Sequence, residues 1–121
     1  MIVRLDLIIN FKISKQMSKF VYFGVYGRGE KVRILLNYKK VEFIDERIGF
    51  EEFGPRKAAG EFPNGQVPVW IHNGKYYNES SAILRYLGKL HGAYPEDAEL
   101  AYITDNAVDF ANDYVGKFYP D

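Results

Sequence analysis

The residue types in this chain limit the chemistry that it could perform. It has no cysteine, so any thiol chemistry must use a thiol that a ligand supplies. The two histidines, His72 and His91, have neither metal-ligand spacing nor nearby acidic partners, so no metal site is expected. Ser80 is a natural N-cap for a predicted helix, whose start offers N–H groups and positive partial charge that favour a bound carboxylate. The same serine could simply cap its own helix, as most serines at helix starts do.

The composition is that of an ordinary globular protein. Of 121 residues, 47% are hydrophobic and 26% are charged, which suits one compact domain, alone or with the start of a second. Lys and Arg together number 16, as do Asp and Glu, so no net positive field attracts nucleic acid or an anionic membrane. We therefore expect neither as a partner.

The first 18 residues, Met1 to Ser18, form an extension with an alternating apolar pattern. Arg4, Asp6 and Asn10 interrupt that pattern, so it does not resemble a secretory signal, and it is too short and polar to span a bilayer. Alternation predicts an extra edge strand. The alternative is that translation starts at Met17 and that the preceding residues are an unstructured tail.

Hydrophobic periodicity predicts the order β-α-β, irregular helix, β-β-α. Asn73-Gly74 lies between two β-type runs and is a strong signal for a type I′ hairpin turn. A right-handed crossover with a parallel strand pair is expected for the opening β-α-β unit. The predicted elements are strand Phe20–Phe23, helix Glu30–Lys40 with Val32, Leu35, Leu36 and Lys39 marking its inner stripe and its edge, strand Val41–Ile48, an irregular helix within Gly49–Gly60, strands Val67–His72 and Lys75–Asn78, and a helix from Ser80 to about Gly92.

A further helix is predicted over Ala98–Val115, after a break at Tyr94-Pro95. We interpret it as the first helix of a second, helical domain that is truncated in this chain. The expected division is an N-terminal extension over residues 1–18, a first domain over residues 19–93, and a linker with the new helix over residues 94–121.

Three segments of the chain carry motifs that occur together in one family. They are Tyr22–Arg33, Phe62–Trp70 with its Gly65-Gln66-Val67-Pro68 core, and Asn78–Leu87 with its Glu79-Ser80 pair opening a helix. In this order and at this separation they resemble the cytosolic glutathione S-transferases, nearest to the tyrosine-type sigma class. The resemblance runs from Lys19 to Tyr94. It implies a thioredoxin-like α/β domain, β-α-β-α-β-β-α, with a four-stranded mixed sheet, followed by the start of an all-helical domain.

The resemblance also implies a glutathione site. Pro68 would follow a cis peptide bond, so that the Val67 backbone pairs with the cysteinyl unit as an added strand does. Ser80 would bind the γ-glutamyl carboxylate, and Glu79 the α-ammonium group. On residue type alone, Glu79 could equally be a solvated surface charge.

Three more residues complete the implied glutathione site. Gln66 would add a hydrogen bond, and Lys57 would approach the glycyl carboxylate, although a solvated lysine is the simpler alternative. Phe53 stands where many relatives have a tryptophan that donates its indole N–H. Phenylalanine has no donor, so this contact is not expected here.

Tyr22 is the predicted catalytic residue, because it ends the first strand at the position of the family's activating tyrosine. A free thiol with a pKa of about 8.5 is mostly protonated at neutral pH, whereas the thiolate is the nucleophile. A phenolic hydrogen bond to the sulfur would favour the thiolate. Arg28 would support the loop, or form a structural ion pair across the domain boundary. Asp105 would reach the glutathione of a neighbouring subunit, unless it is merely one acid of a surface helix.

The function that this resemblance implies is glutathione transfer to a small electrophile, in a cytoplasmic homodimer active in detoxification. Two alternatives remain open from the sequence. One is a glutathione-binding or structural paralogue or fragment without useful turnover. The other is a glutathione-dependent isomerase that uses the same Tyr22. A glutaredoxin-like redox role is excluded, because it needs a protein cysteine.

Overall fold

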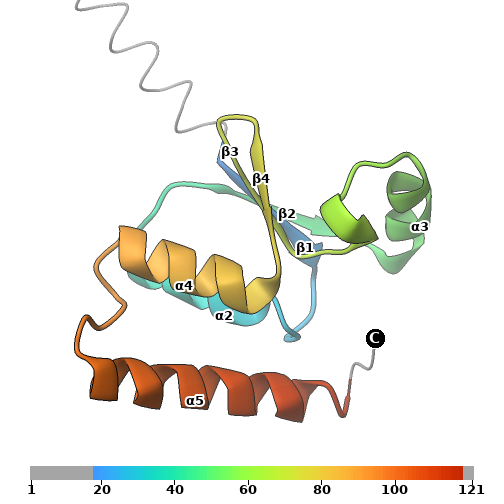
Figure 1. The fold of residues 1–121 in the computed structure, drawn as a ribbon. Helices are drawn as coiled ribbons and strands as arrows, with labels where there is room; N and C mark the ends of the chain where they lie inside the picture. Colours follow the sequence, from blue (N-terminus) through green and yellow to red (C-terminus); the bar gives the residue numbers. More distant parts are fainter. Residues whose placement is uncertain (1–17, 119–121) are drawn as a thin grey trace, which may run out of the picture.

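A computed structural model describes residues 18–118 of the chain, in which helices flank a four-stranded sheet (Figure 1). Except for Ser18, the N-terminal extension lies outside the described residues. The alternatives of an edge strand or a tail therefore stay predictions.

The sheet is mixed, as predicted. Its strands are β1 (Lys19–Phe23), β2 (Ile44–Ile48), β3 (Val69–His72) and β4 (Lys75–Asn78), in the spatial order β2-β1-β3-β4. β1 pairs in parallel with β2 and antiparallel with β3, which forms a hairpin with β4. Asn73 and Gly74 have φ values of 50° and 79°, as a type I′ turn requires.

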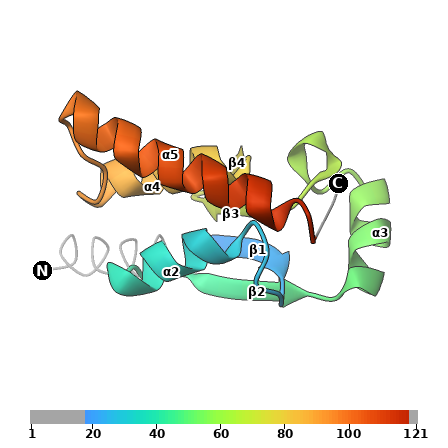
Figure 2. The ribbon, with the colours of Figure 1, turned by 90° about the horizontal axis from the view of Figure 1, so that it is seen from below.

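Two helices, α2 (Glu30–Tyr38) and α4 (Ser80–Leu90), cover one face of the sheet, and α3 (Phe50–Ala58) lies on the other side (Figure 1). A short 3-10 turn, η1 (Pro63–Gly65), precedes β3. The last helix, α5 (Ala98–Val115), runs beside α2 and α4 (Figure 2). The fold is therefore thioredoxin-like with one added helix. Within residues 18–118, no helix has the length and apolar content needed to cross a bilayer.

The core divides into two clusters because side chains alternate across the sheet. The larger cluster lies between the sheet and helices α2 and α4, and the smaller one lies on the α3 side. The larger comprises Phe20, Tyr22, Val32, Leu36, Trp70, Ile83 and Leu87, and the smaller comprises Val21, Ile48, Phe62 and Val69.

Arg33 lies on the buried side of α2, although the periodicity did not predict it there. Its side chain is only 1% exposed, whereas Lys39, predicted at the edge of the inner stripe, is exposed. Arg33 Nε donates to Asp45 Oδ1 over 2.8 Å. Its guanidinium also donates to two carbonyls at the end of β1, those of Phe23 at 2.8 Å and Tyr22 at 3.3 Å. These partners account for the burial of a charged side chain.

The segment Gly49–Gly60 also differs from its prediction. It contains a nine-residue α-helix with Pro55 inside, rather than a short irregular one. The Gly49 N–H donates to Glu52 Oε1 over 3.2 Å, so a side chain from the first turn closes the start of the helix. This local hydrogen bond helps a helix form despite its central proline.

Candidate functional site

Strand register brings the predicted site residues to one end of the sheet. Val21 pairs with Val69, and Val69 pairs with Asn78. The residues after Val21, before Val69 and after Asn78 therefore lie side by side. This end of the sheet holds Tyr22 from β1, the segment before β3, and Glu79 at the start of α4.

The Tyr22 side chain is buried beneath the loop that joins β1 to α2, with only 6% of its surface exposed. Burial raises the pKa of its hydroxyl above 10.0, an effect partly offset by backbone hydrogen bonds from Gly29 and Arg28 and by the charges of Arg28 and Arg33. The phenol therefore keeps its proton at neutral pH. Since the loop N–H groups are donors, they use the oxygen's lone pairs and leave its hydrogen for a ligand.

Two glycines give Tyr22 its space. A Cβ atom at Gly29 would lie 2.5 Å from the Tyr22 ring, and one at Gly27 would collide with the hydroxyl oxygen. Neither glycine has a positive φ, so their backbone conformation does not require glycine. Glycine is required because the Tyr22 side chain lies too close to allow a side chain at either position. The loop thus fits closely over the tyrosine.

The segment before β3 presents an extended backbone. The Val67–Pro68 peptide bond is cis, as the resemblance implies. Pro68 is buried and Val67 is half-buried. Among residues 18–118, the N–H and C=O groups of Val67 have no backbone hydrogen-bond partner. They can pair with an extended ligand at this position.

The start of α4 corrects one prediction. Ser80 is the first residue of the helix rather than its cap, because Glu79 occupies the cap position with φ 72° and ψ 109°. No described side chain caps this end of the helix. The first N–H groups of α4 are therefore available to an anion, and the unusual backbone of Glu79 is of the kind that accompanies binding sites.

Phe53, Lys57 and Gln66 lie together on the α3 side. The Phe53 ring stacks on Phe62 with centroids 5.9 Å apart, so this partly buried aromatic packs against the smaller core cluster. Lys57 Nζ lies 5.7 Å from the Phe53 ring centroid, and Lys57 Cε lies 3.0 Å from where a Cβ at Gly65 would be. Gln66, the residue after Gly65, is exposed. The Lys57 side chain thus lies against Gly65, two residues before Val67 in the chain.

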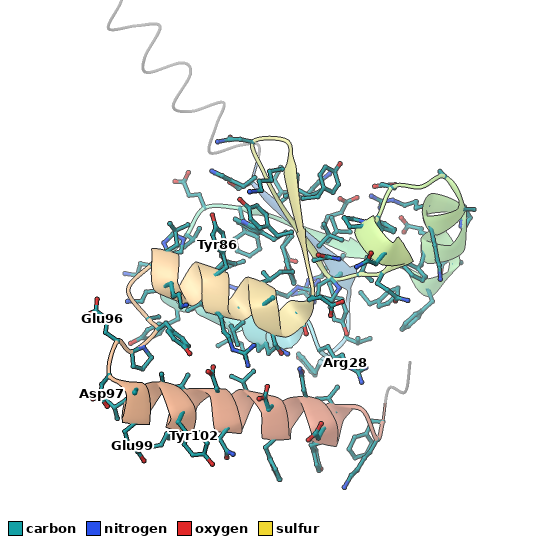
Figure 3. The ribbon with its side chains drawn as sticks, in the orientation of Figure 1. Arg28, Tyr86, Glu96, Asp97, Glu99 and Tyr102 are labelled. Carbon is teal, nitrogen blue, oxygen red and sulfur yellow. The ribbon has the colours of Figure 1, made fainter. Side chains whose placement is uncertain are left out.

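Arg28 reaches across to the last helix. One guanidinium nitrogen lies 3.0 Å from the position of a Cβ at Gly116, which follows α5 (Figure 3). This placement brings the loop between β1 and α2 close to the end of α5, and the domain boundary near residue 94 stays a prediction. The supporting role of Arg28 in catalysis stays a prediction.

Asp105 has its hydrogen-bond partners away from the other candidate site residues. It accepts hydrogen bonds from Arg85 Nε at 2.8 Å and from the Tyr94 hydroxyl at 2.7 Å. Arg85, and secondly Tyr94, hold the pKa of Asp105 below its usual value. Both carboxylate oxygens therefore have partners within the chain, and the expected contact with a neighbouring subunit stays untested.

Lys31 joins this end of the sheet without having been predicted there. Its ammonium nitrogen lies 3.1 Å from Ser80 Oγ. A lysine in the first turn of an amphipathic helix is ordinarily a solvated residue, so no local pattern predicts this contact.

The chain is similar to a known protein family in both sequence and fold. The family described as "Glutathione S-transferase, N-terminal domain" matches residues 18–89. Glutathione S-transferase 3 of Caenorhabditis elegans is 38% identical over 100 residues, which are 83% of this chain and 47% of that protein. The structure of a Nu-class enzyme from Haemonchus contortus aligns with a TM-score of 0.71 at 30% identity, covering 82% of this chain and 48% of that one.

A third relative is the prostaglandin synthase D of Nilaparvata lugens. Its structure aligns with a TM-score of 0.73 at 35% identity, covering 87% of this chain and 53% of that one. The chain spans about half the length of the curated relatives that it matches, 47% in the case of the C. elegans protein. With a family match over most of the described residues and relatives of this similarity, the chain belongs to the glutathione S-transferase family.

Proposed function

We propose that this chain binds glutathione and stabilises its thiolate, which then attacks an electrophilic carbon. One observation carries the proposal. A buried, protonated Tyr22 hydroxyl lies at the same end of the sheet as an uncapped helix start and the unpaired backbone of Val67. These three features offer complementary contacts to a peptide that has a thiol at its centre and a carboxylate at each end.

The γ-glutamyl end of glutathione would bind at α4. Its carboxylate accepts hydrogen bonds from the Ser80 hydroxyl and from the first N–H groups of the helix, where the helix dipole adds attraction. Its ammonium group pairs with Glu79, which is exposed and adjacent. The cysteinyl unit then pairs with the Val67 backbone, which directs the thiol toward Tyr22.

The glycyl end would lie toward α3. Lys57 supplies a positive charge for the glycyl carboxylate, and Gln66 supplies an amide donor or acceptor. Phe53 contributes only packing, since it stacks on Phe62 and has no polar atom. The glycyl end therefore depends on Lys57 and Gln66.

The chemical step begins when the Tyr22 hydroxyl donates to the glutathione sulfur. A hydrogen bond to a charged acceptor contributes about 1.5–3 kcal/mol, which lowers a thiol pKa by roughly one to two units. The proton leaves to solvent. The sulfur lone pair then forms a carbon–sulfur bond, and the leaving group departs with its bonding electrons.

Ser80→Ala tests the binding mode. We expect it to weaken binding to immobilised glutathione by roughly tenfold, because a hydrogen bond to a carboxylate is lost. Ser81→Ala is the matched control, since Ser81 is the next residue of the same helix and should lose little. Equal retention losses for the two variants would contradict this assignment of the carboxylate.

Isomerisation is a second candidate function. It is supported by the name of one structural relative, prostaglandin synthase D. An isomerase would use the same thiolate, adding it to a carbon of the substrate and later eliminating it. The resemblance further implies a cytoplasmic homodimer and a domain boundary near residue 94, which we retain as parts of the proposal.

A further inference from the structure

The Lys31 side chain links three helices at the candidate site. It extends from α2, and its ammonium group donates to Ser80 Oγ in α4 at 3.1 Å and to Asn112 Oδ1 in α5 at 2.5 Å. Asn112 in turn donates through Nδ2 to Ser81 Oγ at 2.6 Å. Both serines at the start of α4 therefore accept a hydrogen bond from this network.

The direction of these hydrogen bonds follows from their chemistry. A lysine ammonium group has only donors, so the Ser80 oxygen must accept with a lone pair. Its own hydrogen then has to point elsewhere. Ser80 is 8% exposed, which leaves its hydroxyl few orientations. Lys31 thus keeps Ser80 as a donor toward any anion that binds at the start of α4.

The charge of Lys31 is incompletely balanced. Among residues 18–118, no carboxylate lies within salt-bridge distance of its ammonium group. Burial, and secondly the charges of Arg28 and Arg85, lower the pKa of Lys31 from 10.5 to about 8, although Asp109 acts in the opposite direction. An anion beside Ser80 would supply the missing negative charge.

We propose that Lys31 is a positioning residue for the γ-glutamyl carboxylate of glutathione, acting by orienting the Ser80 hydroxyl and by its own positive charge. This inference rests on the proposed glutathione site. A purely structural alternative is that Lys31 only ties α2 to α5 through Asn112. That alternative predicts a loss of stability without a specific effect on anion binding.

The two alternatives differ in their pH dependence. A bound carboxylate favours the charged form of Lys31, so binding is strongest while the lysine is protonated. As the pH rises through about 8, the lysine loses its proton, and the neutral amine can accept the Ser80 hydrogen. Affinity should therefore fall above this pH. The groups that face Lys31 are Ser80, Asn112, Arg28, Arg85 and Asp109.

The experiment measures binding of S-methylglutathione by isothermal titration calorimetry at about pH 6.5 and about pH 9, on either side of the lysine's titration. This probe has no thiol, so thiol ionisation cannot contribute. Lys31→Met should weaken binding roughly tenfold at the lower pH. Lys31→Arg, which stays charged at both pH values, should restore most of the affinity and show a smaller fall than wild type. Lys39→Met, in the turn that follows the same helix, is the control and should bind as wild type does.

Several results would overturn the inference. One is a Lys31→Met variant that binds as tightly as wild type at the lower pH. Another is an identical pH dependence in wild type and Lys31→Arg, which would assign the titration to the α-amino group of the probe. If Lys31→Met does not fold, as judged by circular dichroism, the comparison of wild type with Lys31→Arg still distinguishes the positioning role from the structural alternative. No binding by wild type at either pH would instead refute the proposed function itself.

Discussion

Replacing Arg33 by methionine is expected to lower the free energy of unfolding by about 3 kcal/mol or more. The substitution keeps much of the side-chain volume but removes a buried cation. It leaves Asp45 without its 2.8 Å partner and removes the donors to the carbonyls of Tyr22 and Phe23. Equilibrium urea denaturation, followed by circular dichroism, measures the change.

Arg47→Met is the matched control for this prediction. Arg47 Nε contacts the other oxygen of the same Asp45 at 2.9 Å, but its side chain is 51% exposed. An exposed ion pair contributes about 0–1 kcal/mol, so this variant should remain close to wild type. If both arginine variants lose the same stability, the buried contacts of Arg33 do not support the end of β1 as described.

Tyr22→Phe is expected to raise the pKa of the bound glutathione thiol by roughly one to two units, toward the free value of about 8.5. The ring and its packing remain, and only the hydroxyl donor is lost. Affinity for glutathione should change little, because the peptide backbone and both carboxylates keep their contacts. The thiolate can be followed by its ultraviolet absorbance across pH in the complex.

Tyr26→Phe is the control for this second prediction. Tyr26 lies on the same loop and carries the same phenol, but it is 84% exposed. Its variant should titrate as wild type does. A pKa increase in the Tyr26 variant and none in the Tyr22 variant would transfer the activating role to Tyr26.

Much of the fold was predictable because its signals are local. The Asn73-Gly74 turn has the two positive φ values that its residue types favour, and the helix Ala98–Val115 has the predicted ends. The β-α-β crossover accounts for the parallel β1–β2 pair and the hairpin for the β3–β4 pair, whereas the β1–β3 pair joins segments that are distant in the sequence. The placement of Tyr22 and Ser80 at one end of the sheet is then a consequence of register.

What could not be predicted depends on contacts between residues distant in the sequence. Arg33 is buried because Asp45 and two strand carbonyls meet it there, and nothing in the periodicity of α2 indicates them. Lys31 reaches Asn112, 81 residues further along the chain. Ser80 was expected to cap α4, but the left-handed backbone of Glu79 places it inside the helix. Such outcomes are set by packing rather than by local preference.

Whether this site turns the glutathione thiol into a thiolate is measured most directly by ultraviolet titration of glutathione bound to the wild-type chain. We predict that the bound thiol titrates roughly one to two units below the free value of about 8.5, so that thiolate absorbance is present at neutral pH. Displacement by S-methylglutathione should abolish that absorbance. A bound thiol that titrates at the free value would contradict the account, and the chain would then be a glutathione-binding protein without thiol activation.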